Sequence, residues 1–125
     1  MAYDEVDVER VRRLLSDRSD VVEKRIVGGG WGFMVDGHLT CGVSTRGLTV
    51  RVGAAAIDDA LAHDHVRRLE LGGRPTAAFV VVEPDGYRDD DALRHWVERG
   101  LQFVETLGWN TSDDRDGRTG PQRVT

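Results

Sequence analysis

Two short motifs place histidine beside groups that do chemistry in enzymes and metal sites. His38 precedes Cys41 by three residues, and a nearby histidine can act as the base that activates a cysteine nucleophile. His63 and His65 flank an aspartate, and a His-x-His pair could supply two of the ligands of a metal ion. Whether either chemistry is available depends on the elements that carry these residues.

The cysteine and the histidine of the first motif are predicted to point to opposite faces of a β-sheet. Asp36-Gly37 separates two short apolar runs, and this dipeptide favours the positive φ angles of a two-residue type I′ turn. Counted from that turn, Cys41 faces the core and His38 the other side, because side chains alternate along a strand. We therefore interpret Cys41 as a small buried hydrophobic residue.

The other candidate chemistries lack partners in the sequence. No second ligand pair with suitable spacing accompanies His63 and His65, and histidine near a helix C-terminus is favourable without a metal. Gly28–Gly30 runs into a strand, and no Gly-Lys-Ser/Thr follows, so it lacks the context of a phosphate loop. Turn and helix-cap duties account for the carboxylates of residues 83–91. We predict no catalytic residue, no metal and no cofactor.

Two successive β-hairpins over Gly28–Val52 form the stretch around which the rest of the chain is organised. The first turn is Asp36-Gly37, and the second is predicted at Arg46-Gly47. With period-two alternation, these turns predict a core face that comprises Met34, Leu39, Cys41, Val43, Leu48, Val50 and Val52. The opposite, mixed face would contain Trp31, Phe33, Val35, His38, Thr40, Gly42, Ser44, Thr49 and Arg51.

The mixed face is the predicted interaction surface. Trp31, Gly42 and Arg51 are expected in one row, where the indole lies over the glycine and the guanidinium approaches its ring. Large exposed apolar patches usually mark contact sites, although a terminal helix could equally cover this face. The predicted partner-binding residues are Trp31, Phe33, Val35, Thr40, Thr49 and Arg51.

The rest of the chain supplies helices and further strands. Apolar residues at steps of three and four predict helices over Asp4–Ser16, Ala54–Ala62 and Asp89–Leu107. Apolar and alternating runs predict strands over Val21–Val27, Arg67–Leu71 and Ala77–Val82. The order α-β(4)-α-β(2)-α predicts an α+β two-layer sandwich, an antiparallel β-sheet with helices packed on one face. Residues 1–108 would form this domain, and residues 109–125 a disordered polar tail.

Composition and charge limit the classes of function that the chain can have. The chain has 125 residues, one cysteine and a net charge of −5; it has no apolar run of the ~20 residues that a membrane span needs. Its acidic start lacks the features of a secretory signal, so we expect a cytoplasmic protein. The negative charge argues against non-specific nucleic-acid binding, but a local basic patch of Lys24, Arg25, Arg46 and Arg74 leaves that alternative open.

Several short motifs together resemble the TfoX/Sxy N-terminal domain. They are Lys24-Arg25, Gly28-Gly29, Phe33-Met34-Val35, Asp36-Gly37, Cys41-Gly42-Val43, Leu48, Arg51-Val52-Gly53 and Gly73-Arg74-Pro75, together with the opening MAYDE. The match departs from the family pattern at Ile26-Val27, where Met-Phe is usual, and at 76–79, where a Met and a Gly-Trp are common. The resemblance covers residues 1–108.

This resemblance implies a two-layer α/β domain without catalytic residues. Full-length members regulate natural competence together with a cyclic-AMP receptor protein and carry a second, helical domain, which we do not find here. We expect a non-enzymatic regulatory or protein-interaction module, with a homodimer left open. The alternatives are a nucleic-acid-binding regulator, and a small-molecule binder or enzyme with a pocket near the turns at Gly28–Gly30 and Gly72–Pro75.

Overall fold

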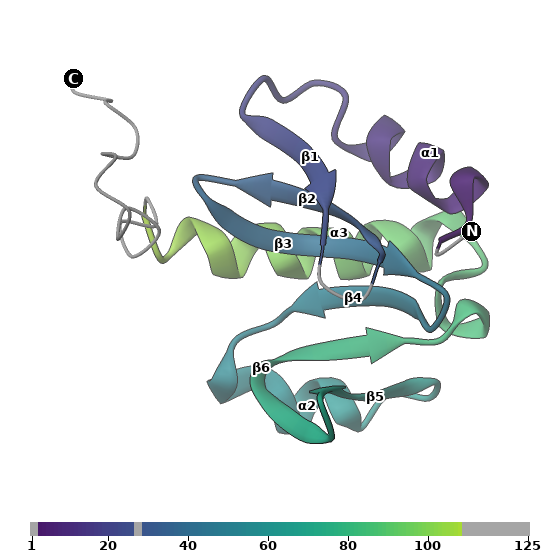
Figure 1. Cartoon of the computed structure of the whole chain (residues 1–125), viewed down its shortest axis with the longest axis vertical. Helices are drawn as coiled ribbons and strands as arrows, with labels where there is room; N and C mark the ends of the chain where they lie inside the picture. The colour runs from purple at the N-terminus through teal and green to yellow at the C-terminus, as the bar shows by residue number, and fades with distance from the viewer. Residues whose placement is uncertain (1–2, 27–28, 109–125) are drawn as a thin grey trace.

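The computed structural model describes residues 3–26 and 29–108, and the predicted tail lies outside them. The elements follow one another along the chain as labelled in Figure 1: α1 (Glu5–Leu14), β1 (Val21–Arg25), β2 (Trp31–Val35), β3 (His38–Ser44), β4 (Gly47–Arg51), the 3₁₀ turn η1 (Ala54–Ala56), α2 (Ile57–Leu61), β5 (Val66–Leu71), β6 (Arg74–Val82), the 3₁₀ turn η2 (Pro84–Tyr87) and α3 (Asp90–Glu105). No helix in the described ranges is long and apolar enough to cross a membrane.

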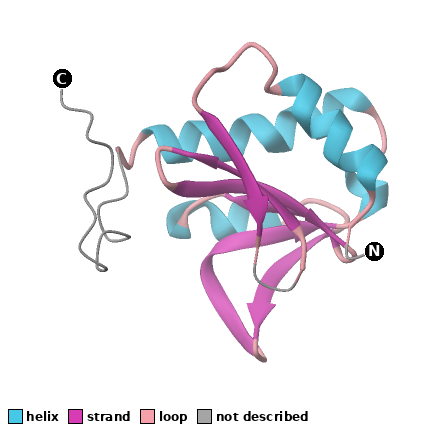
Figure 2. Cartoon of the chain, turned by 45° about the horizontal axis from the view of Figure 1, so that its top comes forward, coloured by secondary structure: helices cyan, strands magenta, loops and turns pink. Residues whose placement is uncertain are grey.

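The strands form one antiparallel sheet in the order β1-β2-β3-β4-β6-β5. The long helix α3 packs on β3 and β4, α2 packs on β5 and β6, and α1 contacts β3 and α3. In Figure 1 α3 passes behind the sheet, and Figure 2 shows the helices gathered on one side of the strands. The predicted α+β sandwich with helices on one face is confirmed.

The amphipathic pattern of α3 sets how it covers the sheet. Its apolar stripe, which comprises Leu93, Trp96, Val97, Gly100 and Val104, is buried. Asp89 caps the N-terminus by accepting a 2.8 Å hydrogen bond from the backbone of Ala92, and Gly108 follows the helix with a φ of 68°. A Cβ on Gly100 would lie 2.7 Å from the carbonyl oxygen of Thr40, so the missing side chain lets α3 approach β3 closely.

The first hairpin has the predicted turn but not the predicted register. Asp36 and Gly37 both have positive φ, 53° and 81°, and Val35 pairs with His38. The register then shifts by one residue between Phe33 and Met34, so that Phe33 pairs with Cys41 and Trp31 with Val43. Thr40 is the extra residue on β3, which is a β-bulge.

The second hairpin turns one residue earlier than predicted. Ser44 pairs with Gly47, so Thr45 and Arg46 form the loop and Val43 pairs with Leu48. The difference from the predicted pairing is two residues along the partner strand. Because side chains repeat every two residues, a slip of two leaves every β4 side chain on its predicted face.

The one-residue bulge, in contrast, moves every side chain of β2 to the face opposite the predicted one. Phe33 lies directly across from Cys41 and belongs with it to the hydrophobic core, and Trp31 packs against that core. Val35 and Thr40 are also buried, and Thr40 meets Gly100 of α3. The predicted partner-binding set of Trp31, Phe33, Val35, Thr40, Thr49 and Arg51 was therefore wrong as a single surface, because a count from the turn cannot register an inserted residue.

Candidate functional site: the open-face groove

A row of paired residues that includes two glycines crosses the sheet face opposite the helices. Lys24, Gly32, Gly42, Thr49 and Val81 follow one another across five strands. A Cβ on Gly32 would clash with Ile26, and one on Gly42 would lie 2.8 Å from the same side chain. Because the two glycines lack side chains, they leave a space on this face that the Ile26 side chain fills.

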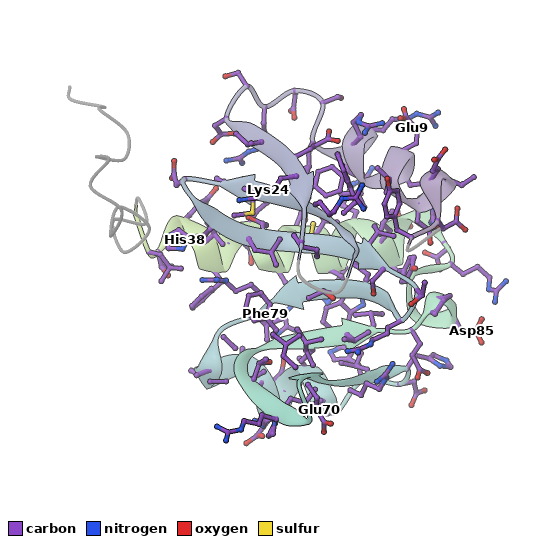
Figure 3. The ribbon with its side chains drawn as sticks, viewed as in Figure 1. Glu9, Lys24, His38, Glu70, Phe79 and Asp85 are labelled. Atoms are coloured by element: carbon purple, nitrogen blue, oxygen red, sulfur yellow. The ribbon has the colours of Figure 1, made fainter. Side chains whose placement is uncertain are left out.

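A concavity of about 710 Å³ lies on this face; we call it the open-face groove. Its apolar lining consists of Ile26, Met34, Leu39, Leu69, Leu71, Ala77, Ala78 and Phe79. Four hydroxyl-bearing residues, Ser44, Thr45, Thr49 and Thr76, also line it. Figure 3 labels Lys24 on the upper strands of the view and Phe79 on the lower ones. The groove therefore spans the sheet from β1 to the β5–β6 hairpin.

Three cations, Lys24, Arg25 and Arg46, complete the lining, and none of the described lining residues is acidic. The structure thus brings together three members of the predicted basic patch. The fourth, Arg74, lies exposed at the start of β6, opposite the groove residue Leu71. The positive charge at this groove contrasts with the net charge of −5 of the whole chain.

Arg51 lies at the end of β4 and stacks on a different ring from the one predicted. Its guanidinium carbon is 4.7 Å from the centre of the Phe79 ring, its partner across β6. Its Nη1 donates to His38 Nδ1 at 3.5 Å, and burial lowers the pKa of Arg51. The expected contact with Trp31 was wrong, because Trp31 is on the helix-covered side.

Trp31 is held instead by Glu23 of β1 and by Tyr3, which precedes α1. Its Nε1 donates to Glu23 Oε1 at 2.8 Å, and its ring lies 5.7 Å from that of Tyr3. Arg12 donates to both oxygens of Glu23, at 2.9 and 2.7 Å. Arg12, aided by the Trp31 hydrogen bond, lowers the pKa of Glu23 against the opposing effect of burial. This network ties α1 to the edge of the sheet.

The predicted reason for separating His38 from Cys41 was wrong, because the bulge puts both on the helix-covered side. The ring nitrogens of His38 are nevertheless engaged elsewhere. Since Arg51 donates to Nδ1, Nε2 carries the proton and donates to the carbonyl of Gly108 at 2.8 Å. Complete burial raises the pKa of the Cys41 thiol to about 12, which suits a packing role and not a thiolate nucleophile.

In the structure, His63 of the His-x-His motif packs against neighbouring rings. The His63 ring meets Trp96 edge-on at 5.1 Å and His95 at 5.9 Å, while His65 has a φ of 69°. Within the described ranges no three His, Cys, Asp or Glu residues gather as metal ligands.

Sequence reasoning missed the apolar lining of the groove. The sequence predicted Met34 and Leu39 in the core. The structure places them at the groove, and Phe33 and Cys41 lie in the core. The one available signal was the run Ala77–Val82, which is apolar on both faces: Val80 and Val82 join the core, and Ala77 and Phe79 line the groove.

Comparison with known proteins gives one match. The family model described as TfoX N-terminal domain matches residues 13–104, which is most of the chain. No curated protein and no solved structure matches. Proteins of the matched family are generally not enzymes.

Proposed function

Since the chain belongs to the TfoX N-terminal domain family, we propose that it is a non-enzymatic, cytoplasmic regulatory module that binds a protein through the open-face groove. The observation that carries this proposal is the unequal covering of the sheet. Three helices bury one face, and the other keeps an apolar concavity of about 710 Å³. Concave apolar surfaces on otherwise polar domains are typical contact sites.

Exposed apolar side chains at the groove support the proposal. Leu71 is 45% exposed and lines the groove, and Val22 is 61% exposed. Val22 pairs with the groove residue Met34, so it extends the same face toward the sheet edge. The residues of the interaction surface are therefore Val22, Met34, Leu39, Leu71 and Phe79, with Thr49 retained from the sequence prediction.

A leucine-to-aspartate exchange at the groove tests this function. Leu71→Asp would place a charge on the surface, with Leu107→Asp as the matched control, because Leu107 is 39% exposed and outside the groove lining. Both variants and the parent would be studied by size-exclusion chromatography with light scattering and by affinity capture from cells. We expect self-association or partner capture to be lost in Leu71→Asp alone. Identical oligomeric states and identical captured proteins in all three would refute the proposal.

Nucleic-acid binding is the second candidate, and the three groove cations support it. Such binding depends on phosphate neutralisation and weakens steeply as the salt concentration rises. A gel shift at low salt with duplex and single-stranded DNA is the direct test. The absence of any shift would remove this candidate and leave the protein-binding proposal as it stands.

A further inference from the structure

The unpaired positive charges of the domain gather around the groove. Among the described residues, eight arginines form ion pairs with carboxylates: Arg10, Arg12, Arg13, Arg18, Arg67, Arg88, Arg94 and Arg99. In the same part of the chain, six basic residues have no such pair: Lys24, Arg25, Arg46, Arg51, Arg68 and Arg74. Three of these six line the groove, where the described residues contribute no acidic group to offset them.

We infer that the groove binds an amphipathic α-helix of another protein, whose apolar stripe lies on the groove floor and whose flanking Asp or Glu residues meet Lys24, Arg25 and Arg46. The inference rests on the proposed protein-binding function and specifies the partner's chemistry. Complementary potentials of this kind speed encounter and select partners of the opposite charge.

The helical form of the partner segment follows from the groove floor, by which we mean the side chains of Met34, Leu39, Thr49 and Phe79. Met34, Leu39, Thr49 and Phe79 come from β2, β3, β4 and β6, and each of these strands already has a neighbour on both sides. Their backbone groups are therefore used within the sheet, and a partner cannot join them as an added strand. A segment buried on such a floor must satisfy its own backbone N–H and C=O groups, and an α-helix does so.

The charge pattern argues against a second copy of the chain as the occupant. In a two-fold symmetric dimer the same patch lies on both subunits. Two copies of the groove would then bring Lys24, Arg25 and Arg46 of one subunit toward those of the other. Like charges without intervening carboxylates oppose such pairing.

The floor argues against nucleic acid as its occupant. Bases of single strands bind by stacking on several aromatic rings, whereas Phe79 is the one aromatic residue among the described lining residues. The remaining floor is aliphatic and suits apolar side chains such as those of a helix stripe.

Matched peptides provide the test. The probe is a fluorescein-labelled amphipathic peptide of about 16 residues, roughly 24 Å of helix, with Leu at i, i+3, i+4 and i+7 and Glu beside that stripe. The control peptide replaces every Glu by Lys. We expect the Glu peptide to bind the full chain about tenfold or more tightly than the Lys peptide, by fluorescence anisotropy at low salt. The difference should shrink as salt screens the charges.

Charge-reversal variants locate the binding. Lys24→Glu and Arg46→Glu should each weaken binding of the Glu peptide severalfold. Arg13→Glu is the control, because Arg13 is exposed on α1 and outside the groove lining, and it should leave the affinity unchanged. Leu71→Asp should weaken binding of the Glu peptide, because it places a carboxylate in the groove.

Three outcomes overturn the inference: no binding of the Glu peptide, equal or tighter binding of the Lys peptide, or single-stranded DNA that displaces the Glu peptide from the groove. None of these alone refutes the proposed function, because partner capture that depends on Leu71 would still stand. Conversely, captured proteins that are indifferent to Leu71→Asp refute the proposed function whatever the peptides do.

Discussion

Phe33 and Cys41 face each other across β2 and β3, and both side chains are completely buried. This pair fixes which side of the first hairpin packs on the helices. Met34, the next residue along β2, consequently points to the open-face groove. The two neighbours should therefore respond very differently to truncation.

Phe33→Ala should lower the free energy of unfolding by about 3–5 kcal/mol, because it removes a ring from a closed core. Met34→Ala should cost only about 1 kcal/mol, because its side chain is partly exposed at the groove. Urea denaturation followed by circular dichroism measures both. A larger loss for Met34→Ala than for Phe33→Ala would mean that the faces are assigned the wrong way round.

Gly100→Ala should destabilise the domain although alanine is the better helix former. Alanine gains about 1 kcal/mol in a helix interior, but its Cβ would lie 2.7 Å from the backbone oxygen of Thr40, and overpacking typically costs about 1–3 kcal/mol. Gln102→Ala on the exposed side of α3 is the control and should change the melting temperature little. If Gly100→Ala raises the melting temperature, the close contact between α3 and β3 is absent.

The Cys41 thiol should be inert in the folded protein. Its pKa is raised by burial from 9.0 to about 12, so the neutral thiol stabilises the fold below pH 9, and this contribution is lost as the pH rises toward 12. At pH 8 a disulfide reagent such as dithionitrobenzoate should react with Cys41 only after unfolding in denaturant. Fast labelling of the native protein would contradict complete burial.

His95 should make stability depend on pH in the mildly acidic range. Burial lowers its pKa below 6.5, helped by Arg99 and His63 and opposed by Glu98 and Asp59. As the pH falls through 6.5, the unfolded chain takes up a proton before the folded one, so stability decreases with decreasing pH. Urea midpoints at several pH values should show a shallower decrease for His95→Gln, and equal slopes would show that His95 does not contribute.

The sequence alone determined the elements and their order. The helical stripes, the Asp36-Gly37 turn and the doubly apolar run Ala77–Val82 are local patterns, and each is set by residues within a few positions of one another. The family was also visible at this level, because its motifs are short and contiguous. The unpaired state of the basic residues was not, since some arginines, such as Arg67 and Arg99, find their carboxylate partners on distant segments.

Only the tertiary structure decided which side chains share a surface. The bulge at Thr40 inserts one residue, and one residue is half the repeat of a strand. It therefore moved Phe33 and Val35 into the core, packed Trp31 against the core, and brought Met34 and Leu39 to the groove. Nothing near Thr40 in the sequence signals the bulge; Thr40 instead meets α3 at Gly100, sixty residues later in the chain. Contacts between distant segments, which local patterns do not encode, therefore placed the candidate site.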